Sequence, residues 1–67
     1  MDVSDAIKAF KRIYPEDSIQ IFKTKQIYNN TYILGASFPD GDFYFVIDGN
    51  TVSSSFDDYN SARKSIY

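Results

Sequence analysis

The middle of the chain carries large apolar side chains in both phases of its expected strands. Residues 31–38 and 42–48 each have the alternation and the aromatic and β-branched content of a β-strand. Because successive side chains of a strand point to opposite faces of its sheet, each face receives several large apolar groups. A small sheet backed by one helical layer should be apolar on one face only. This chain must therefore cover both faces of its sheet or leave an apolar face for a partner.

Turn residues separate the expected strands. The asparagines of residues 29–30 tolerate positive φ, as a tight hairpin requires. Residues 39–41 form the next turn, where proline presets φ and glycine accepts a left-handed conformation. A three-residue loop there would pair Ala36 with Tyr44, whereas a four-residue loop would change every pair. A short fourth strand is expected over residues 51–53.

The first expected strand, residues 18–28, loses its alternation near Phe22. Ile19 and Ile21 share one phase of this strand, but Lys23 falls in the same phase. Either a β-bulge shifts the register at this point, or the outer half of the strand projects beyond the core.

Two amphipathic helices flank the strands. In residues 3–14 the apolar residues recur at steps of three and four, so they share one stripe. The members of this stripe are Val3, Ala6, Ile7, Phe10, Ile13 and Tyr14. Asp2 is placed to cap this helix. A shorter helix is expected over residues 56–66, where Ser55 and Asp58 resemble a capping box.

The order of helix, three or four antiparallel strands and helix predicts an α+β, two-layer domain. A chain of 67 residues forms one domain at most, so residues 1–67 are expected to fold as a single small unit. Two arrangements of the helices are open. One helix on each face would bury both sides of the sheet, whereas both helices on one face would leave an exposed apolar surface of the kind that binds partners.

The composition excludes several chemistries. The chain has no histidine and no cysteine, which removes the commonest general base, the commonest metal ligand and any disulfide. The carboxylate pairs Asp40/Asp42 and Asp57/Asp58 fit a turn and a helix start rather than a calcium loop or an acid/base pair. No base is placed to activate the serines of residues 53–55. We therefore expect a protein that is not an enzyme and that binds no metal and no cofactor.

Charge and hydropathy bear on partners and location. Seven Lys and Arg against nine Asp and Glu give a net charge of −2, which disfavours nucleic-acid binding through bulk charge. No run approaches the roughly 18 apolar residues that span a membrane. The N-terminus is acidic where a signal peptide would be basic. We expect a cytoplasmic protein with no membrane partner.

Two known families resemble the chain in organisation. A helix containing Asp5 is followed by a strand, by residues 31–34, and by residues 40–48, which lead into a turn and a short strand. This pattern resembles the PepSY domain over residues 5–52, and the resemblance implies an inhibitory or interaction module. The order of helix, strands and helix is also similar to that of the double-stranded RNA-binding domain. That family carries a lysine cluster at the start of its second helix, where this chain has Asp57, so the resemblance extends to topology only.

Three functions fit these observations. The leading hypothesis is a small regulatory or inhibitory protein-interaction module, of bacterial or phage origin, that binds a protein partner or a second copy of itself. Its site would be an exposed apolar and aromatic sheet face that includes Ile33, Tyr44 and Val46. The alternative is a nucleic-acid-binding domain with a basic patch on the first helix and first strand, formed by Lys8, Lys11, Arg12, Lys23 and Lys25. A third hypothesis is a structural subunit of a larger assembly.

Overall fold

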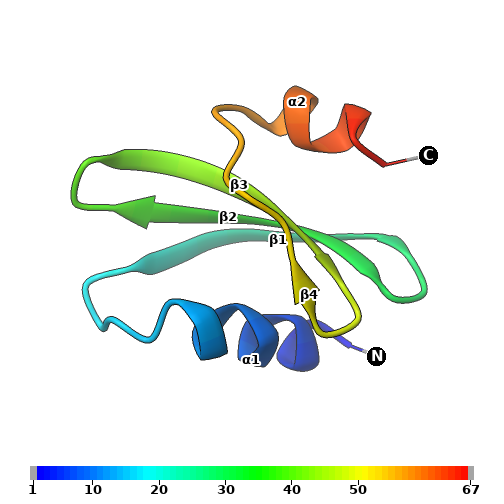
Figure 1. The fold of residues 1–67 in the computed structure, drawn as a ribbon, viewed down its shortest axis with the longest axis horizontal. Helices are drawn as coiled ribbons and strands as arrows, with labels where there is room; N and C mark the ends of the chain where they lie inside the picture. The colour runs from blue at the N-terminus through cyan, green and yellow to red at the C-terminus, as the bar shows by residue number, and fades with distance from the viewer. Residues whose placement is uncertain (1, 67) are drawn as a thin grey trace.

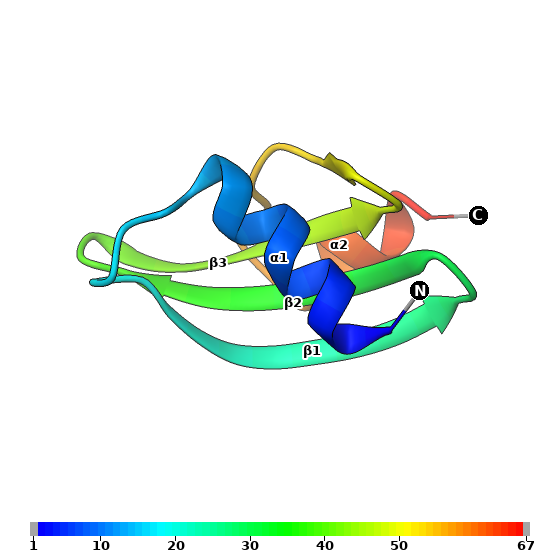
Figure 2. The ribbon, with the colours of Figure 1, turned by 90° about the horizontal axis from the view of Figure 1, so that it is seen from below.

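The computed structural model describes residues 2–66 and shows a four-stranded antiparallel sheet with one helix on each face (Figure 1). The elements are α1 (Val3–Ile13), β1 (Gln20–Tyr28), β2 (Thr31–Phe38), β3 (Gly41–Asp48), β4 (Thr51–Val52) and α2 (Tyr59–Lys64). The strands lie in the sheet in chain order. Seen from below, α1 crosses in front of the sheet and α2 lies behind it (Figure 2). The predicted α+β class and element order are confirmed, and the helices form two layers on opposite sides instead of one.

Helix α1 begins at a capping box formed by two aspartates. The backbone N–H of Asp5 donates to Asp2 Oδ1 at 3.0 Å, and the backbone N–H of Asp2 donates to Asp5 Oδ2 at 3.3 Å. These bonds satisfy N–H groups near the helix start that lack a partner within the helix. The residues that α1 buries are Ala6, Ala9 and Phe10. Val3 and Ile13 of the predicted stripe are exposed, because they are the first and last residues of the helix.

A β-bulge in β1 explains the break in alternation at Phe22. Ile21 pairs with Ala36 and Lys23 pairs with Gly35, so Phe22 is the extra residue. Of the two predicted explanations, the register shift is therefore correct. Beyond the bulge, the lysine lies opposite the glycine and shares its face of the sheet.

Both long hairpins close through two-residue turns. β1 joins β2 through residues 29–30, as predicted, but within residues 2–66 only glycines have positive φ. A second irregularity near the end of β1 increases the local twist that a positive-φ turn otherwise provides. The turn after β2 consists of residues 39–40, because Gly41, with φ of 146°, already pairs with Phe38.

The short turn after β2 sets the register of the central hairpin. Gly35 lies opposite Tyr44, and Ile33 lies opposite Val46. Neither of the two loop lengths considered from the sequence is correct, because the turn has two residues, and Ala36 pairs with Phe43 instead of Tyr44. This slip exchanges the faces to which the side chains of β3 were assigned relative to β2.

The main core lies between α1 and the sheet. Phe10 is fully buried, and its ring centroid lies 5.0 Å from that of Tyr14 and 5.1 Å from that of Phe45. Phe38 joins this cluster at 5.6 Å from Tyr14 and 5.8 Å from Phe45. The other buried members are Ala6, Ala9, Ile19, Tyr32, Leu34, Ala36 and Ile47. Rings at these distances stabilise a core beyond the burial of their area.

The opposite face is covered by α2 and by the segment that leads to it. Phe56 exchanges two backbone hydrogen bonds with Tyr44, of 2.9 and 2.8 Å, and so pairs with the outer side of β3. Because Phe56 belongs to this bridge, α2 begins three residues later than predicted. Asp58, and not Ser55, is its N-cap, and Asp58 Oδ1 accepts from the backbone N–H of Ser61 at 2.7 Å.

Candidate functional site

The residues predicted to bind a partner through the sheet lie beneath the C-terminal part of the chain. Ile33 has no exposed surface, so it does not reach a partner. Tyr44 is half-buried, and its ring centroid lies 5.8 Å from that of Phe22 and 6.1 Å from that of Tyr59. Val46 is half-buried beside the segment after β4. The predicted exposed face must therefore be corrected, because α2 and its approach cover it.

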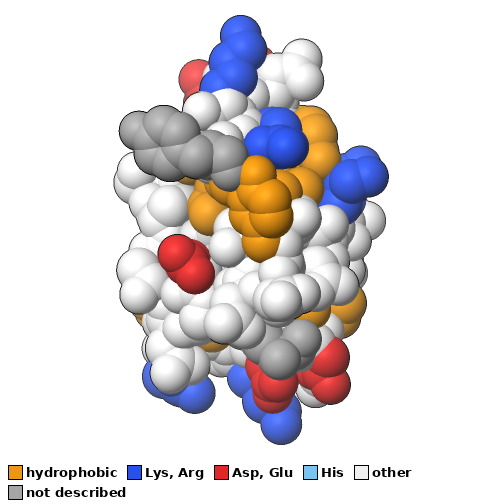
Figure 3. Space-filling model, turned by 90° about the vertical axis from the view of Figure 1, so that its right-hand side faces the viewer, with side chains coloured by type: hydrophobic (Ala, Val, Ile, Leu, Met, Phe, Trp, Pro, Cys, Tyr) orange, Lys and Arg blue, Asp and Glu red, His pale blue; other side chains and the backbone are white. Residues whose placement is uncertain are grey.

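The predicted basic residues lie on opposite sides of the sheet. The three that belong to α1 are Lys8, Lys11 and Arg12. Lys23 and Lys25 belong to β1, and Lys23 Nζ lies 5.0 Å from the ring centroid of Tyr59, in α2. Figure 3 shows basic side chains in the upper part and at the lower edge of one side of the molecule, with other surface between them. The sheet therefore divides the predicted patch into two parts.

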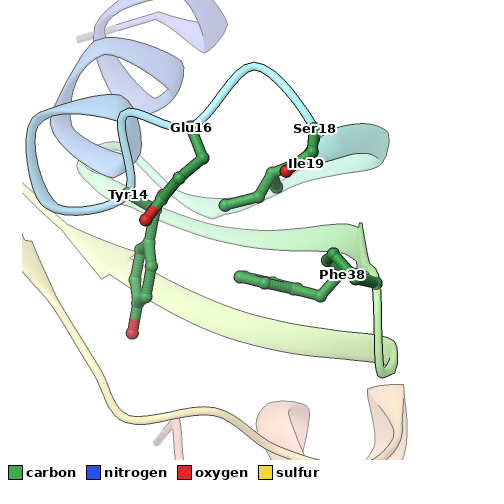
Figure 4. Close-up of a pocket in the computed structure, with 6 residues that line it drawn as sticks. Tyr14, Glu16, Ser18, Ile19 and Phe38 are labelled. Carbon is green, nitrogen blue, oxygen red and sulfur yellow. The ribbon is translucent and has the colours of Figure 1, made fainter.

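A pocket of about 320 Å³ opens between the end of α1, the loop before β1 and the turn after β2 (Figure 4). Its lining consists of Tyr14, Glu16, Ser18, Ile19, Phe38 and Pro39. The side chains of Ile19 and Phe38 extend toward the Tyr14 ring (Figure 4). Pockets of roughly 300–1,000 Å³ with mostly apolar walls and a few polar groups are the usual form of ligand sites.

Two prolines shape this pocket. Pro15 follows Tyr14, the C-cap of α1, and disfavours a helical conformation there, so the chain leaves the helix axis. The loop then closes through a hydrogen bond from the backbone N–H of Ile19 to the carbonyl of Glu16, at 3.3 Å. Pro39 occupies the first position of the turn after β2 and forms the opposite wall.

The pocket suits an apolar or aromatic group. Tyr14 and Phe38 are half-buried members of the core cluster, with ring centroids 5.6 Å apart. A group placed against them would extend the core and remove further apolar surface from water. Glu16 is exposed and is the one carboxylate in the described lining. The pocket therefore combines an apolar interior with one negative charge at its rim.

The sequence analysis did not predict this pocket, although the sequence contains a feature that points to it. Tyr14-Pro15 and Phe38-Pro39 are both aromatic–proline pairs at the end of an element. Each aromatic was assigned to the apolar phase of its own helix or strand. Their proximity depends on how α1 crosses the sheet, which the pattern of a single element does not specify.

A second hollow, of about 550 Å³, lies along the end of the first hairpin. Its lining consists of the consecutive residues Gln26, Ile27, Tyr28 and Asn29. One short stretch of chain cannot surround a ligand, whereas the walls of the pocket at Tyr14 and Phe38 come from three parts of the fold. The smaller pocket is therefore the better-formed site.

Among the acidic pairs, Asp58 has a clear structural role. The hydrogen bonds that it accepts from the backbone and side chain of Ser61 lower the pKa of the Asp58 carboxyl below its ordinary value of 3.8, and Lys64 adds a smaller effect. Asp42 lies opposite Ser37 in the ladder between β2 and β3. Within residues 2–66, no three acidic side chains gather closely enough to hold a metal ion.

Comparison of the chain with protein-family models, with curated proteins and with solved structures gives no match. The resemblances to the PepSY domain and to the double-stranded RNA-binding domain therefore stay predictions. In the described part of the chain, neither helix is long and apolar enough to cross a membrane.

Proposed function

We propose that this protein is a small protein-binding module with a regulatory or inhibitory role, and that its pocket accepts an apolar or aromatic side chain of a partner. The observation that carries the proposal is the pocket formed by Tyr14, Ile19 and Phe38. The leading hypothesis from the sequence is kept, and its site moves from the sheet face to this pocket.

The arrangement matches how protein interfaces obtain their affinity. A few large side chains that enter well-packed pockets contribute most of the binding energy of an interface. Here the pocket walls are held by the ring cluster of the core, so little ordering is needed when a partner binds. Ile13 is 53% exposed and directly precedes Tyr14, so it adds apolar surface at the same end of α1.

The rim favours a basic residue beside the anchoring side chain. Glu16 lines the pocket and is exposed, and Asp17 follows it in the same loop. A partner segment with Lys or Arg next to its anchor would pair with this charge, mainly gaining specificity and association rate.

Selection of phage-displayed random peptides on the immobilised protein tests the proposal. We expect enrichment of sequences with an aromatic or large aliphatic residue beside Lys or Arg. In NMR titrations, the selected peptide should shift the backbone amides of Tyr14, Ser18 and Phe38. Absence of enrichment, or shifts confined to other parts of the fold, would overturn the proposal.

Two single variants at exposed positions test the pocket, and a third serves as their control. Ser18→Phe should fill the pocket and weaken peptide binding by about tenfold or more. Glu16→Lys should weaken it by roughly threefold to tenfold. Asp48→Lys makes the same change of charge at the far end of β3 and should leave the affinity within about twofold. An equal loss in Asp48→Lys would mean that charge alone drives binding, contrary to the proposal.

A further inference from the structure

Strand β1 is the one long open edge of the described sheet. β3 is paired on both sides: β2 lies on one side, and β4, Ser53 and Phe56 lie on the other. β4 has two residues, whereas β1 has nine and pairs only with β2 in residues 2–66. An edge strand of this length offers backbone groups to which another extended chain can pair.

The charges of β1 disfavour pairing with a second copy of β1 and favour pairing with an acidic strand. The strand contains Lys23 and Lys25, both exposed, and no acidic residue. They lie opposite Gly35 and Ile33, so both project on the face that carries α2. If two copies of β1 paired antiparallel about Thr24, each Lys23 would oppose a Lys25, which is unfavourable. An acidic strand would instead meet both lysines with carboxylates at alternate positions.

An aromatic ring beside these lysines is half exposed and rests on the sheet. Phe22 is 48% exposed, and its ring lies over Gly35, where an added Cβ would come within 2.8 Å of Cε1 and 2.9 Å of Cζ. The Tyr44 ring meets it edge-on, with centroids 5.8 Å apart. Glycine therefore makes room for the ring to rest on the sheet. Because half of the Phe22 ring is exposed, it has apolar surface with which to make an additional contact.

We propose that β1 accepts an extended acidic segment of another protein as a fifth strand, with carboxylates near Lys23 and Lys25 and an apolar side chain against Phe22. Charge complementarity and the open edge carry this inference, and neither depends on the pocket at Tyr14 and Phe38. The hydrogen-bonded ladder would supply affinity, and the two lysines and the ring would select the sequence.

The test uses fluorescent peptides of about eight residues with alternating glutamate and valine, whose carboxylates all fall on one face of a strand. Fluorescence anisotropy should show saturable binding of this peptide to the intact protein. The same peptide N-methylated at every backbone nitrogen should not bind, because neither of its edges can then donate hydrogen bonds to β1. A lysine–valine peptide should not bind either.

Matched variants locate the site. Lys25→Glu should weaken binding of the glutamate–valine peptide by about tenfold, and Phe22→Ala by about threefold to tenfold. Lys8→Glu, an equal charge change on the opposite side of the sheet, should change it less than about twofold. Absence of binding, undiminished binding of the N-methylated peptide, or an equal loss in Lys8→Glu would overturn the proposal. Glu16→Lys should leave this binding intact, so the pocket and the edge can fail separately.

Discussion

The two faces of the sheet are both apolar in sequence, but they are covered in different ways. On one face, an eleven-residue helix buries three side chains over a continuous cluster of rings that includes Phe10 and Phe45. On the other face, a six-residue helix buries only Ala62. Ile33 is fully covered there, but Phe22 is 48% exposed and Tyr44 is half-buried.

The difference indicates that one face of the sheet mainly stabilises the fold, whereas the other keeps side chains exposed for binding. The α1 face buries the rings of Phe10, Tyr32 and Phe45. Burial of apolar surface is the main source of stability for a domain this small. On the other face, α2 covers the centre of the sheet and leaves an aromatic ring and two lysines of β1 exposed. This partial coverage leaves a surface at which a partner can bind. The proposed pocket lies at the end of α1, and the proposed edge site lies on β1 beside α2.

The largest effect expected from this comparison is the loss of the α1 core. Phe10→Ala should lower the free energy of unfolding by about 3–5 kcal/mol, because a fully buried ring leaves a cavity. The whole stability of a chain of this length is roughly 3–10 kcal/mol, so much of the population should unfold. Urea titration followed by circular dichroism measures the change.

The same helix provides the control. Ile13→Ala removes a large side chain that is 53% exposed, and should cost less than about 1 kcal/mol. Equal losses in the two variants would show that α1 does not pack through Phe10, and would remove the contrast between the two faces.

A smaller effect is expected on the α2 face, at Gly35. An added Cβ would lie 2.8 Å from Phe22 Cε1 and 3.0 Å from Tyr44 Cε2, so the rings must move. Because Phe22 is half-exposed, its ring can swing outward, and Gly35→Ala should cost only about 1 kcal/mol. In a Phe22→Ala background the cost should nearly vanish, as a double-mutant cycle of thermal unfolding would show. Additive losses would mean that the ring does not rest on the glycine.

The sequence predicted the local elements better than their assembly. The cap at Asp2 and the turn at residues 29–30 follow from short-range steric and hydrogen-bonding rules, and both were placed correctly. The bulge at Phe22 was one of the two explanations that the broken alternation left open. The register after β2 was left between two loop lengths and the structure has a third, because one residue of turn length decides the register and proline and glycine fit several lengths.

The candidate sites were harder to predict because they depend on contacts between elements. Ile33 was assigned to an exposed face, since no local pattern tells which face of the sheet a short C-terminal helix will cover. Lys8 and Lys23 were grouped as neighbours, although the sheet separates α1 from the face where Lys23 meets Tyr59. The pattern along the chain predicts which residues share a face of one helix or strand. Which of these faces meet on the surface of the protein depends on how the elements pack.

The smallest expected effect concerns the cap of α2. The pKa of Asp58 is lowered, so its carboxylate stabilises the folded state above the ordinary value of 3.8 and loses this effect as the pH falls through the lowered value. Acidification through that range should lower the protection factors of the α2 amides against hydrogen exchange and leave the protection factors around Phe10 unchanged. Asp58→Asn keeps a capping side chain that does not titrate, so its α2 should not respond. If α2 responds to acid equally in the wild-type protein and in Asp58→Asn, another titrating group causes the response, and the charge of Asp58 does not stabilise the start of α2.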